Sequence, residues 1–336
     1  MRIFVVRLDR RRMTAIVAAL LLLAAAIYFA ATHRAGHAVP VTAPITVPAS
    51  AVFQDESSVV WPDDLFAFPD ESAFIPTWEN IGMLRTMADK KRYLYNVDAT
   101  AFVTEADLAL PALLAKDLST DFSSEVPKIL IFHTHSQEAF RDSRPGKIED
   151  TIVGIGRLLA EILTREYGIA VVHDIGQYDV RDGVEDRSES YAAMEPAVRK
   201  ILEKYPSIEI AIDLHRDGVP DDIVLRTELY GVPTAKIMFF NGITRLNVNG
   251  TAQELPDLVN PYLRENLATS LQMHLTANTM YPSFTRRIYI KAYRYSLHLL
   301  PKSVLVEVGA NTNTVEEARN AMPPLARIIA ETFKKH

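Results

Sequence analysis

The pattern of apolar and polar positions separates the chain into a short N-terminal run and a longer alternating part. Residues 13–32 contain no charged residue and consist mostly of Ala, Leu, Ile and Val. As a helix these residues would rise ~30 Å, about the thickness of the hydrocarbon core of a bilayer. The pattern therefore predicts one transmembrane helix at 13–32. An extended stalk is expected at 33–58, where Pro, Ala, Thr and Val dominate.

A cleaved signal peptide is the alternative interpretation of the apolar run. The apolar core of a signal peptide usually has ~7–15 residues. Residues 13–32 form a longer run, although the Ala-rich stretch near Ala31 would suit a signal peptidase. A buried helix of a cytosolic fold is disfavoured, because no polar face interrupts the run.

Beyond the stalk, the pattern becomes helical and then alternates between strands and helices. Residues 59–127 predict a mostly helical region, with helices at 78–91 and 105–118 and a short strand at 93–97. In residues 128–336, strands at 129–132, 169–172, 208–214, 235–240 and 304–308 alternate with helices at 149–167, 187–205, 256–278 and 315–335. This alternation predicts an α/β domain with a mainly parallel sheet and helices on both faces.

Composition limits the chemistry that the chain can carry. The chain has no cysteine, which excludes a disulfide scaffold, a zinc finger and a thiol nucleophile, so any metal ion must be bound by His and carboxylates. Its formal net charge of −6 argues against a nucleic-acid binder. Charge is uneven, because residues 1–12 carry +4 and residues 35–336 carry −11. The positive-inside tendency places 1–12 in the cytoplasm as a basic tail and the acidic part on the other side of the cell membrane.

Three polar clusters stand at expected strands of the α/β part. His135 and Glu138 follow the first strand, Asp213 and His215 close the third, and Glu307 lies inside the last one. Each has a structural alternative, namely a hydrogen-bonded core histidine, a local hydrogen bond or a buried ion pair. The carboxyl ends of parallel strands share one edge, however, so the clusters are expected to meet there. Three ligands that leave a position open for water, with a further carboxylate as general base, are typical of a zinc hydrolase.

Six short motifs stand in order along the chain. They are Ile-Leu-Ile-Phe-His-Thr-His-Ser-Gln-Glu at 129–138, Val-Val-His-Asp at 171–174, Asp-Leu-His-Arg-Asp at 213–217, Asn-Pro-Tyr-Leu-Arg-Glu-Asn at 260–266, Tyr-Pro-Ser-Phe-Thr-Arg at 281–286 and Leu-Val-Glu-Val-Gly-Ala-Asn-Thr-Asn at 305–313. Together they resemble the stage II sporulation protein P family from about Tyr93 to the C-terminus.

The resemblance implies a membrane-anchored, zinc-dependent peptidoglycan hydrolase, related to N-acetylmuramoyl-L-alanine amidases with a phosphorylase/hydrolase-like core. It implies cleavage of the muramoyl–L-Ala amide and of stem-peptide cross-links, in the engulfment step of sporulation. Carried over, His135, Glu138 and His215 bind Zn²⁺ and Glu307 is the catalytic carboxylate. The implied partners are peptidoglycan and a lytic transglycosylase such as stage II sporulation protein D.

Four further residues are expected beside the ligands or the substrate. Asp213 stands two residues before His215, so it is a candidate acceptor for a hydrogen bond from that imidazole. Arg216 and Arg294 are candidates for binding a stem-peptide carboxylate, because guanidinium pairs with carboxylates in a two-pronged geometry. His133 is a candidate for orienting the substrate or its neighbour.

Two other functions fit the same features. A metallocarboxypeptidase-like peptidase also uses His-x-x-Glu, a later His and a late Glu. A non-enzymatic envelope tether or scaffold would need only the anchor, the stalk and the aromatic residues between Trp61 and Trp78.

Overall fold

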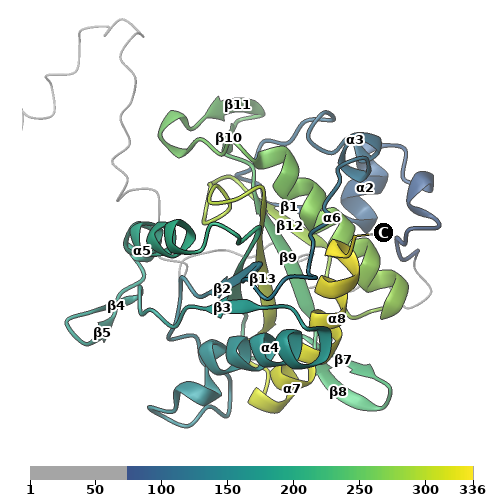
Figure 1. Cartoon of the computed structure of the whole chain (residues 1–336). Helices are drawn as coiled ribbons and strands as arrows, with labels where there is room; N and C mark the ends of the chain where they lie inside the picture. Colours follow the sequence, from purple (N-terminus) through teal and green to yellow (C-terminus); the bar gives the residue numbers. More distant parts are fainter. Residues whose placement is uncertain (1–73, 336) are drawn as a thin grey trace, which may run out of the picture. The chain divides into compact units, whose positions relative to one another are not determined.

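A seven-stranded sheet forms the centre of the computed structural model, which describes residues 74–335 (Figure 1). Its strands are β1 (Tyr95–Val97), β2 (Ile129–Phe132), β3 (Val171–His173), β6 (Ile210–Asp217), β9 (Ile237–Gly242), β12 (Ile288–Lys291) and β13 (Lys302–Ala310). They lie in the order β1-β12-β9-β13-β6-β2-β3. The expected tail at 1–12, anchor at 13–32 and stalk at 33–58 lie outside the described residues.

Helices and hairpins connect these strands. The helices are α2 (Met87–Tyr93), α3 (Leu110–Leu114), α4 (Ile152–Tyr167), α5 (Ser190–Lys204), α6 (Leu263–Met280), α7 (Val315–Asn320) and α8 (Met322–Phe333), with 3-10 turns η3 (Ile81–Met83), η4 (Ile148–Asp150) and η5 (Pro256–Leu258). The two-stranded hairpins are β4 (Val180–Arg181) with β5 (Val184–Glu185), β7 (Arg226–Leu229) with β8 (Val232–Ala235), and β10 (Arg245–Val248) with β11 (Thr251–Glu254). No helix within residues 74–335 is long and apolar enough to span a bilayer.

Strand direction confirms the expected mainly parallel α/β fold, with one reversal. Five of the six neighbouring pairs are parallel, and only β9 and β13 run antiparallel. Strand β9 follows β6 through a hairpin, without the crossover helix that a parallel return would need. Strands β2, β6 and β13, which carry the candidate site residues, all point the same way.

Helices cover both faces of the sheet, as expected. Ile129 and Ile131 of β2 belong to the large core that includes α4, α6 and α8. Leu130 and Phe132, which alternate with them, pack against Met194 on α5 and against its neighbours on the opposite face. Figure 1 shows α5 apart from the group of α4, α6 and α8. The face under α5 is the one that carries the candidate site.

Local chemistry explains where several elements begin and end. Helix α4 ends at Gly168, whose φ of +66° is a left-handed conformation that glycine adopts without strain. The helix expected at 315–335 divides into α7 and α8, because Pro323 and Pro324 lack the N–H groups that a continuous helix needs and stand instead in the first turn of α8. The helix expected at 256–278 begins only at Leu263, after η5 and Pro261.

The region at 59–127 contributes to the sheet. Its short strand β1 pairs in parallel with β12, so the sheet draws on residues before 128 as well as after. Strand β12 was not expected from the sequence pattern.

Candidate active site

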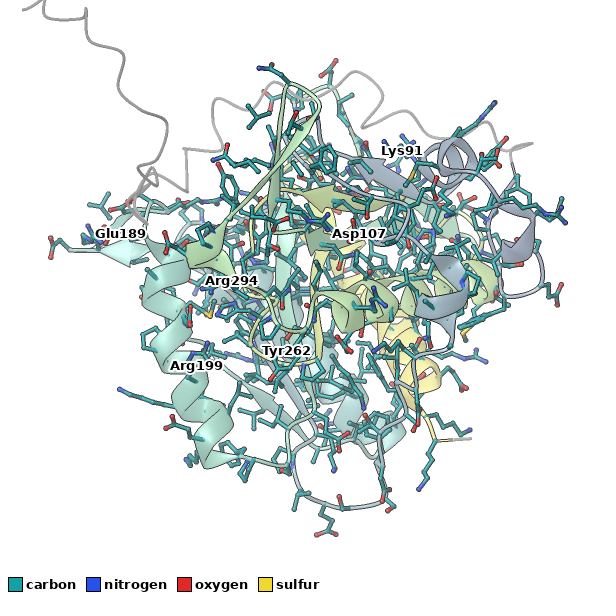
Figure 2. The ribbon with its side chains drawn as sticks, turned by 90° about the horizontal axis from the view of Figure 1, so that it is seen from above. Lys91, Asp107, Glu189, Arg199, Tyr262 and Arg294 are labelled. Atoms are coloured by element: carbon teal, nitrogen blue, oxygen red, sulfur yellow. The ribbon has the colours of Figure 1, made fainter. Side chains whose placement is uncertain are left out.

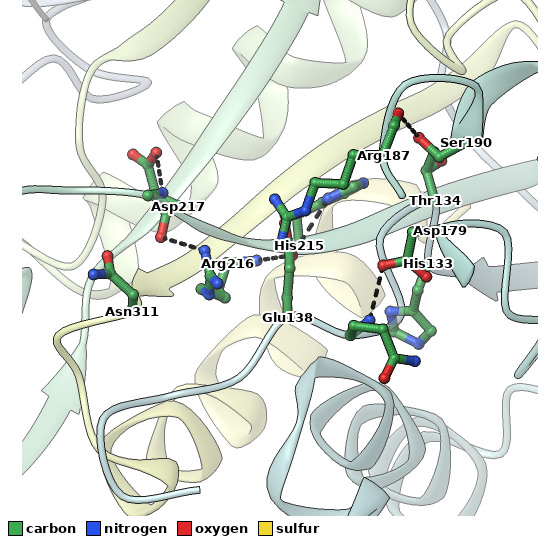
Figure 3. Close-up of polar contacts among 12 residues, drawn as sticks. His133, Thr134, Glu138, Asp179, Arg187, Ser190, His215, Arg216, Asp217 and Asn311 are labelled. Atoms are coloured by element: carbon green, nitrogen blue, oxygen red, sulfur yellow. Dashed lines mark hydrogen bonds and ion pairs between the residues drawn. The ribbon is translucent and has the colours of Figure 1, made fainter. Parts of the chain in front are cut away.

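A cavity of about 30 Å³ on the α5 face of the sheet brings the predicted site residues together. His135, Glu138, His215 and Glu307 all line it. Glu307 on β13 is the register partner of His215 on β6, so these two side chains project from adjacent strands on one face. His135 and Glu138 come from the loop that follows β2, and Figure 3 shows Glu138 beside His215.

Two buried aspartates hold this loop. Thr134 donates to Asp213 from its backbone N–H at 3.0 Å and from its hydroxyl at 2.7 Å. The Ser136 hydroxyl and the Gln137 N–H donate to the two oxygens of Asp179 at 2.6 and 2.9 Å (Figure 3). The irregular backbone between His135 and Glu138 is therefore fixed by side chains rather than by a strand ladder.

His215 lies between two carboxylates. Its Nε2 donates to Asp213 Oδ1 at 2.7 Å, and its Nδ1 lies 3.4 Å from Glu138 Oε2. Burial alone would lower the pKa of His215, but the charges of Asp213 and Glu138 outweigh it and hold the pKa well above its ordinary value. The aspartate therefore accepts from the imidazole, as the sequence spacing suggested.

Two arginines and His215 surround the carboxylate of Glu138. The Arg216 N–H donates to Oε2 at 2.8 Å, and Arg187 Nη1 lies 3.4 Å from Oε1. Burial would raise the pKa of Glu138, but the charge and hydrogen bond of His215, together with Arg216, hold the pKa well below its usual range. Glu138 is therefore an ionised carboxylate inside the protein.

His135 is the third candidate ligand. Its ring centroid lies 5.2 Å from that of His215, and burial lowers its pKa to about 3, with the charge of His215 adding to the effect. A neutral imidazole is the form that binds metal ions. Its buried Nδ1 has no hydrogen-bond partner among the described residues. A buried polar nitrogen is costly unless it forms a hydrogen bond or binds a metal ion.

The ligand atoms offered here, imidazole nitrogens and carboxylate oxygens, are of the types that bind zinc. The 3.4 Å between His215 Nδ1 and Glu138 Oε2 is close to the edge of a tetrahedral zinc site, ~3.3 Å for ligand bonds of ~2.0–2.1 Å. Asp213 behind His215 supplies the carboxylate that usually orients a metal-binding imidazole. In residues 74–335, however, no three such side chains converge closely enough to hold an ion as they stand.

Two of the predicted residues lie outside this cavity. His133 points away from it, donating from Nδ1 to the Leu214 carbonyl at 2.8 Å, with its Nε2 2.9 Å from His173 Nε2. His133 lies against Gly156 of α4, where a Cβ on that glycine would come within 2.5 Å of the imidazole ring, whereas His135 faces the cavity under α5. Arg294 pairs with Glu195 of α5 at 3.0 Å and lies beside α5 in Figure 2. Neither side chain lines the cavity, and the expected roles of His133 in orienting substrate or its neighbour and of Arg294 in binding a stem-peptide carboxylate stay predictions.

Arg216 lines the cavity but is engaged by the backbone. Its Nε donates to the Ala139 carbonyl at 2.9 Å and its Nη1 to the Asp217 carbonyl at 3.2 Å. These bonds fasten the end of the ligand loop to β6. The expected role in binding a stem-peptide carboxylate therefore competes with a structural one.

Sequence reasoning missed four other residues of the cavity wall. Arg187 lies in the loop just before α5 and Tyr191 in the first turn of α5, Lys291 lies at the end of β12, and Tyr295 lies in the loop after it. Tyr191 makes edge contacts with His135 at 5.6 Å and with Tyr295 at 5.6 Å. The available signal was weak, because these residues reach the site only through tertiary packing.

The fold and the site together define an α/β protein with a buried His–carboxylate centre. Residues 86–330 match the Stage II sporulation protein P (SpoIIP) family, and the chain belongs to that family. It is 19% identical to stage II sporulation protein P of Bacillus subtilis (strain 168) over 232 residues, which cover 65% of this chain and 54% of that protein. The chain thus spans about half the length of that relative.

Solved structures of amidases are similar at low identity. N-acetylmuramoyl-L-alanine amidase AmiC2 of Nostoc punctiforme has a TM-score of 0.36 and 14% identity, and the match covers 62% of this chain and 97% of that chain. The CwlD amidase from Clostridioides difficile, in complex with the GerS lipoprotein, has a TM-score of 0.39 and 12% identity, with coverage of 61% and 98%.

Proposed function

We propose that this SpoIIP-family chain is a zinc-dependent peptidoglycan hydrolase that cleaves the amide between N-acetylmuramic acid and L-Ala. The supporting observation is the single cavity that His135, Glu138, His215 and Glu307 share, with Glu307 in register beside His215. Two imidazoles and a carboxylate are a common ligand set of hydrolytic zinc sites, and the fourth side chain is left for proton transfer.

Each residue has a separate task in this proposal. His135, Glu138 and His215 would hold the ion, which when bound acidifies water and polarises a carbonyl group. Glu307 accepts the proton of the attacking water and returns it to the leaving amine. Asp213 holds the proton on Nε2 of His215, so the proton on Nδ1, which faces Glu138, is the one that would be released when the ion binds.

The cellular setting is also part of the proposal. Residues 13–32 would anchor the chain in the cell membrane, with the basic tail inside and residues 59–336 facing the wall. Family membership supports a role in sporulation, in engulfment, with a lytic transglycosylase such as stage II sporulation protein D as partner. The acidic wall-facing part gives no reason to expect nucleic acid among its ligands.

Digestion of purified peptidoglycan tests the activity. With zinc, the wild-type chain is expected to release peptides that begin with L-Ala and to leave muramoyl lactate on the glycan, as identified by mass spectrometry. Glu307→Gln keeps the shape of the side chain but removes the base, so the rate is expected to fall ~10²–10⁴-fold with zinc content unchanged. Wild-type protein that contains zinc but releases nothing would contradict the proposal.

A peptidase is the second candidate, and the cavity gives it one supporting observation. Arg187 and Lys291 on the wall are cations suited to a peptide carboxylate, which metallocarboxypeptidases recognise. Products that contain only cut cross-links or shortened stem peptides, with no L-Ala amino terminus released, would favour this candidate over the amidase.

A further inference from the structure

A second and larger hollow lies over α6 and beside the end of α8. Its volume is about 510 Å³, within the range of ~300–1,000 Å³ that is usual for ligand sites. Gln272 and Thr276 of α6 line it, with Trp78 and the segment 116–119 at its sides and Lys334 just beyond α8. None of the described residues that line it also lines the active-site cavity. We call this hollow the α6 groove.

Trp78 is fixed at the groove while part of it remains in solvent. Its indole Nε1 donates to the Thr276 hydroxyl at 3.1 Å, and its backbone N–H lies 3.4 Å from the Thr279 hydroxyl. The residue is nevertheless 42% exposed. An exposed indole held by its polar edge has lost its rotamer freedom already, so a ligand that stacks on it meets little further entropy cost.

The polar groups of the α6 groove are mixed and balanced in charge. Lys116 and Lys334 stand against Asp117 and Glu331, so the groove has no net field that would favour phosphates. Gln272 uses both amide hydrogens on the carbonyls of 113 and 116, which directs its acceptor oxygen elsewhere. Such a lining suits a ligand that has many hydroxyl groups and few charges.

We propose that the α6 groove binds a glycan strand, with one sugar ring stacked on the Trp78 indole. Sugars combine an apolar face of C–H groups, which packs on an aromatic ring, with a rim of hydroxyl groups, which pair with amide, hydroxyl and charged side chains. Nucleic-acid bases also stack on indoles, but they come with phosphates that this groove does not attract. The proposal concerns binding and does not require that the chain cleave the strand.

The two tryptophans of the chain allow a direct test. Trp61→Phe leaves Trp78 as the sole indole, so intrinsic fluorescence reports on the groove. The full-length chain in detergent, with Glu307→Gln added to prevent hydrolysis, is titrated with glycan strands stripped of peptides. A saturable shift of the Trp78 emission is expected. In sedimentation with the same strands, Trp78→Ala in an otherwise wild-type indole background should bind about tenfold more weakly.

A matched variant separates stacking from folding. Thr276→Val is nearly isosteric and removes only the acceptor of the indole N–H, so it should weaken glycan binding several-fold while the chain still unfolds in one cooperative transition with a slightly lower midpoint. No saturable shift, undiminished binding by Trp78→Ala, or an equal shift with free stem peptide would overturn the proposal. Hydrolysis is measured separately on the Trp61→Phe chain, so loss of the proposed amidase activity and loss of glycan binding are distinct results.

Discussion

At the scale of single residues, the candidate ligands depend on carboxylates that never face the cavity. Asp213 holds Thr134 and His215, and Asp179 holds Ser136 and Gln137. Both aspartates are buried, and their bonds decide how far apart His135 and Glu138 can stand. Metal affinity is therefore expected to depend on residues that do not touch the metal.

Asp179→Asn tests this dependence. The amide is uncharged and replaces one acceptor oxygen by a donor, so the bond from the Ser136 hydroxyl must reverse, the bond from the Gln137 N–H loses its charge assistance, and the loop between the ligands loosens. We expect zinc affinity to fall ~10–100-fold, as is usual when a residue that orients metal ligands is changed. Competition with a chromophoric chelator measures it. Asp186→Asn, whose carboxylate contacts Ser188 and Arg181 instead, is the matched control. Equal zinc affinity in the two variants would show that the loop needs no support from Asp179.

The sequence identified residues whose signal is local and missed those whose signal is not. His135 and Glu138 stand three apart after a strand, and Asp213 stands two before His215, so short spacing was informative. Asp179 and Arg187 act on the same loop from more than 40 residues away. Nothing in their own segment indicates this, because the segment reaches the loop only once the chain has folded.

At the scale of elements, the close packing of α4 against the sheet explains why a residue without a side chain stands at Gly156. A Cβ on Gly156 would lie 2.5 Å from Cε1 of His133 and 3.0 Å from Nε2 of His173, the two imidazoles that bond to each other. His133 donates to the Leu214 carbonyl, so its Nε2 accepts from His173 and the pair has little room to move. This close contact between Gly156 and the imidazole pair belongs to the helix–sheet interface and not to the cavity.

Gly156→Ala is expected to destabilise the fold. Overpacking of this kind costs ~1–3 kcal/mol, because His133 or α4 must shift. Gly82→Ala, where an added Cβ meets nothing within 4 Å, serves as the control and should change the free energy of unfolding by less than ~0.5 kcal/mol. Urea unfolding of both variants measures the difference. Equal free energies of unfolding would mean that His133 and His173 can move to make room for the added methyl group at little cost.

The elements with strong periodicity could be predicted from the sequence, but the direction in which each strand runs in the sheet could not. The strand expected at 129–132 is β2 to the residue, and the helix expected at 149–167 is α4 with a later start. An apolar run does not record which way its strand points, so the reversal of β9 against β13 could not be predicted. The burial of helix α6 could not be predicted from the sequence either. Its buried Asn and Gln side chains donate to distant backbone carbonyls, so the helix lacks the polar face that an amphipathic pattern would show.

At the scale of the whole molecule, zinc is expected to contribute to folding stability. A ligand that binds only the folded chain stabilises it by about 4 kcal/mol at a thousandfold excess over its dissociation constant. We therefore expect zinc to raise the unfolding temperature of the wild-type chain and a chelator to lower it. His135→Ala, which removes one candidate ligand, should abolish most of this response. An unfolding temperature that ignores zinc in the wild type would contradict the metal site.

Acid stability depends on a histidine far from the cavity. His274 is buried in α6, where its Nε2 accepts from the Asn278 amide at 3.0 Å and its ring meets Phe239 edge-on. Burial lowers its pKa to about 3, whereas an unfolded histidine titrates near ~6.5. Below pH ~6.5 the imidazole of the unfolded chain binds a proton, whereas that of the folded chain stays neutral down to about pH 3. The free energy of unfolding therefore falls as the pH drops through ~6.5, and the contribution of His274 is fully present above that pH.

The expected loss from His274 is about 2 kcal/mol between pH 7.5 and 5. His274→Gln can still accept from Asn278 but does not titrate, so its stability should fall less steeply over the same range. Urea unfolding at several pH values compares the slopes, which cancels any constant cost of the substitution and the shared contributions of the other histidines. Parallel slopes for the two proteins would mean that His274 is protonated in the folded chain, and that α6 opens to water well above pH 3.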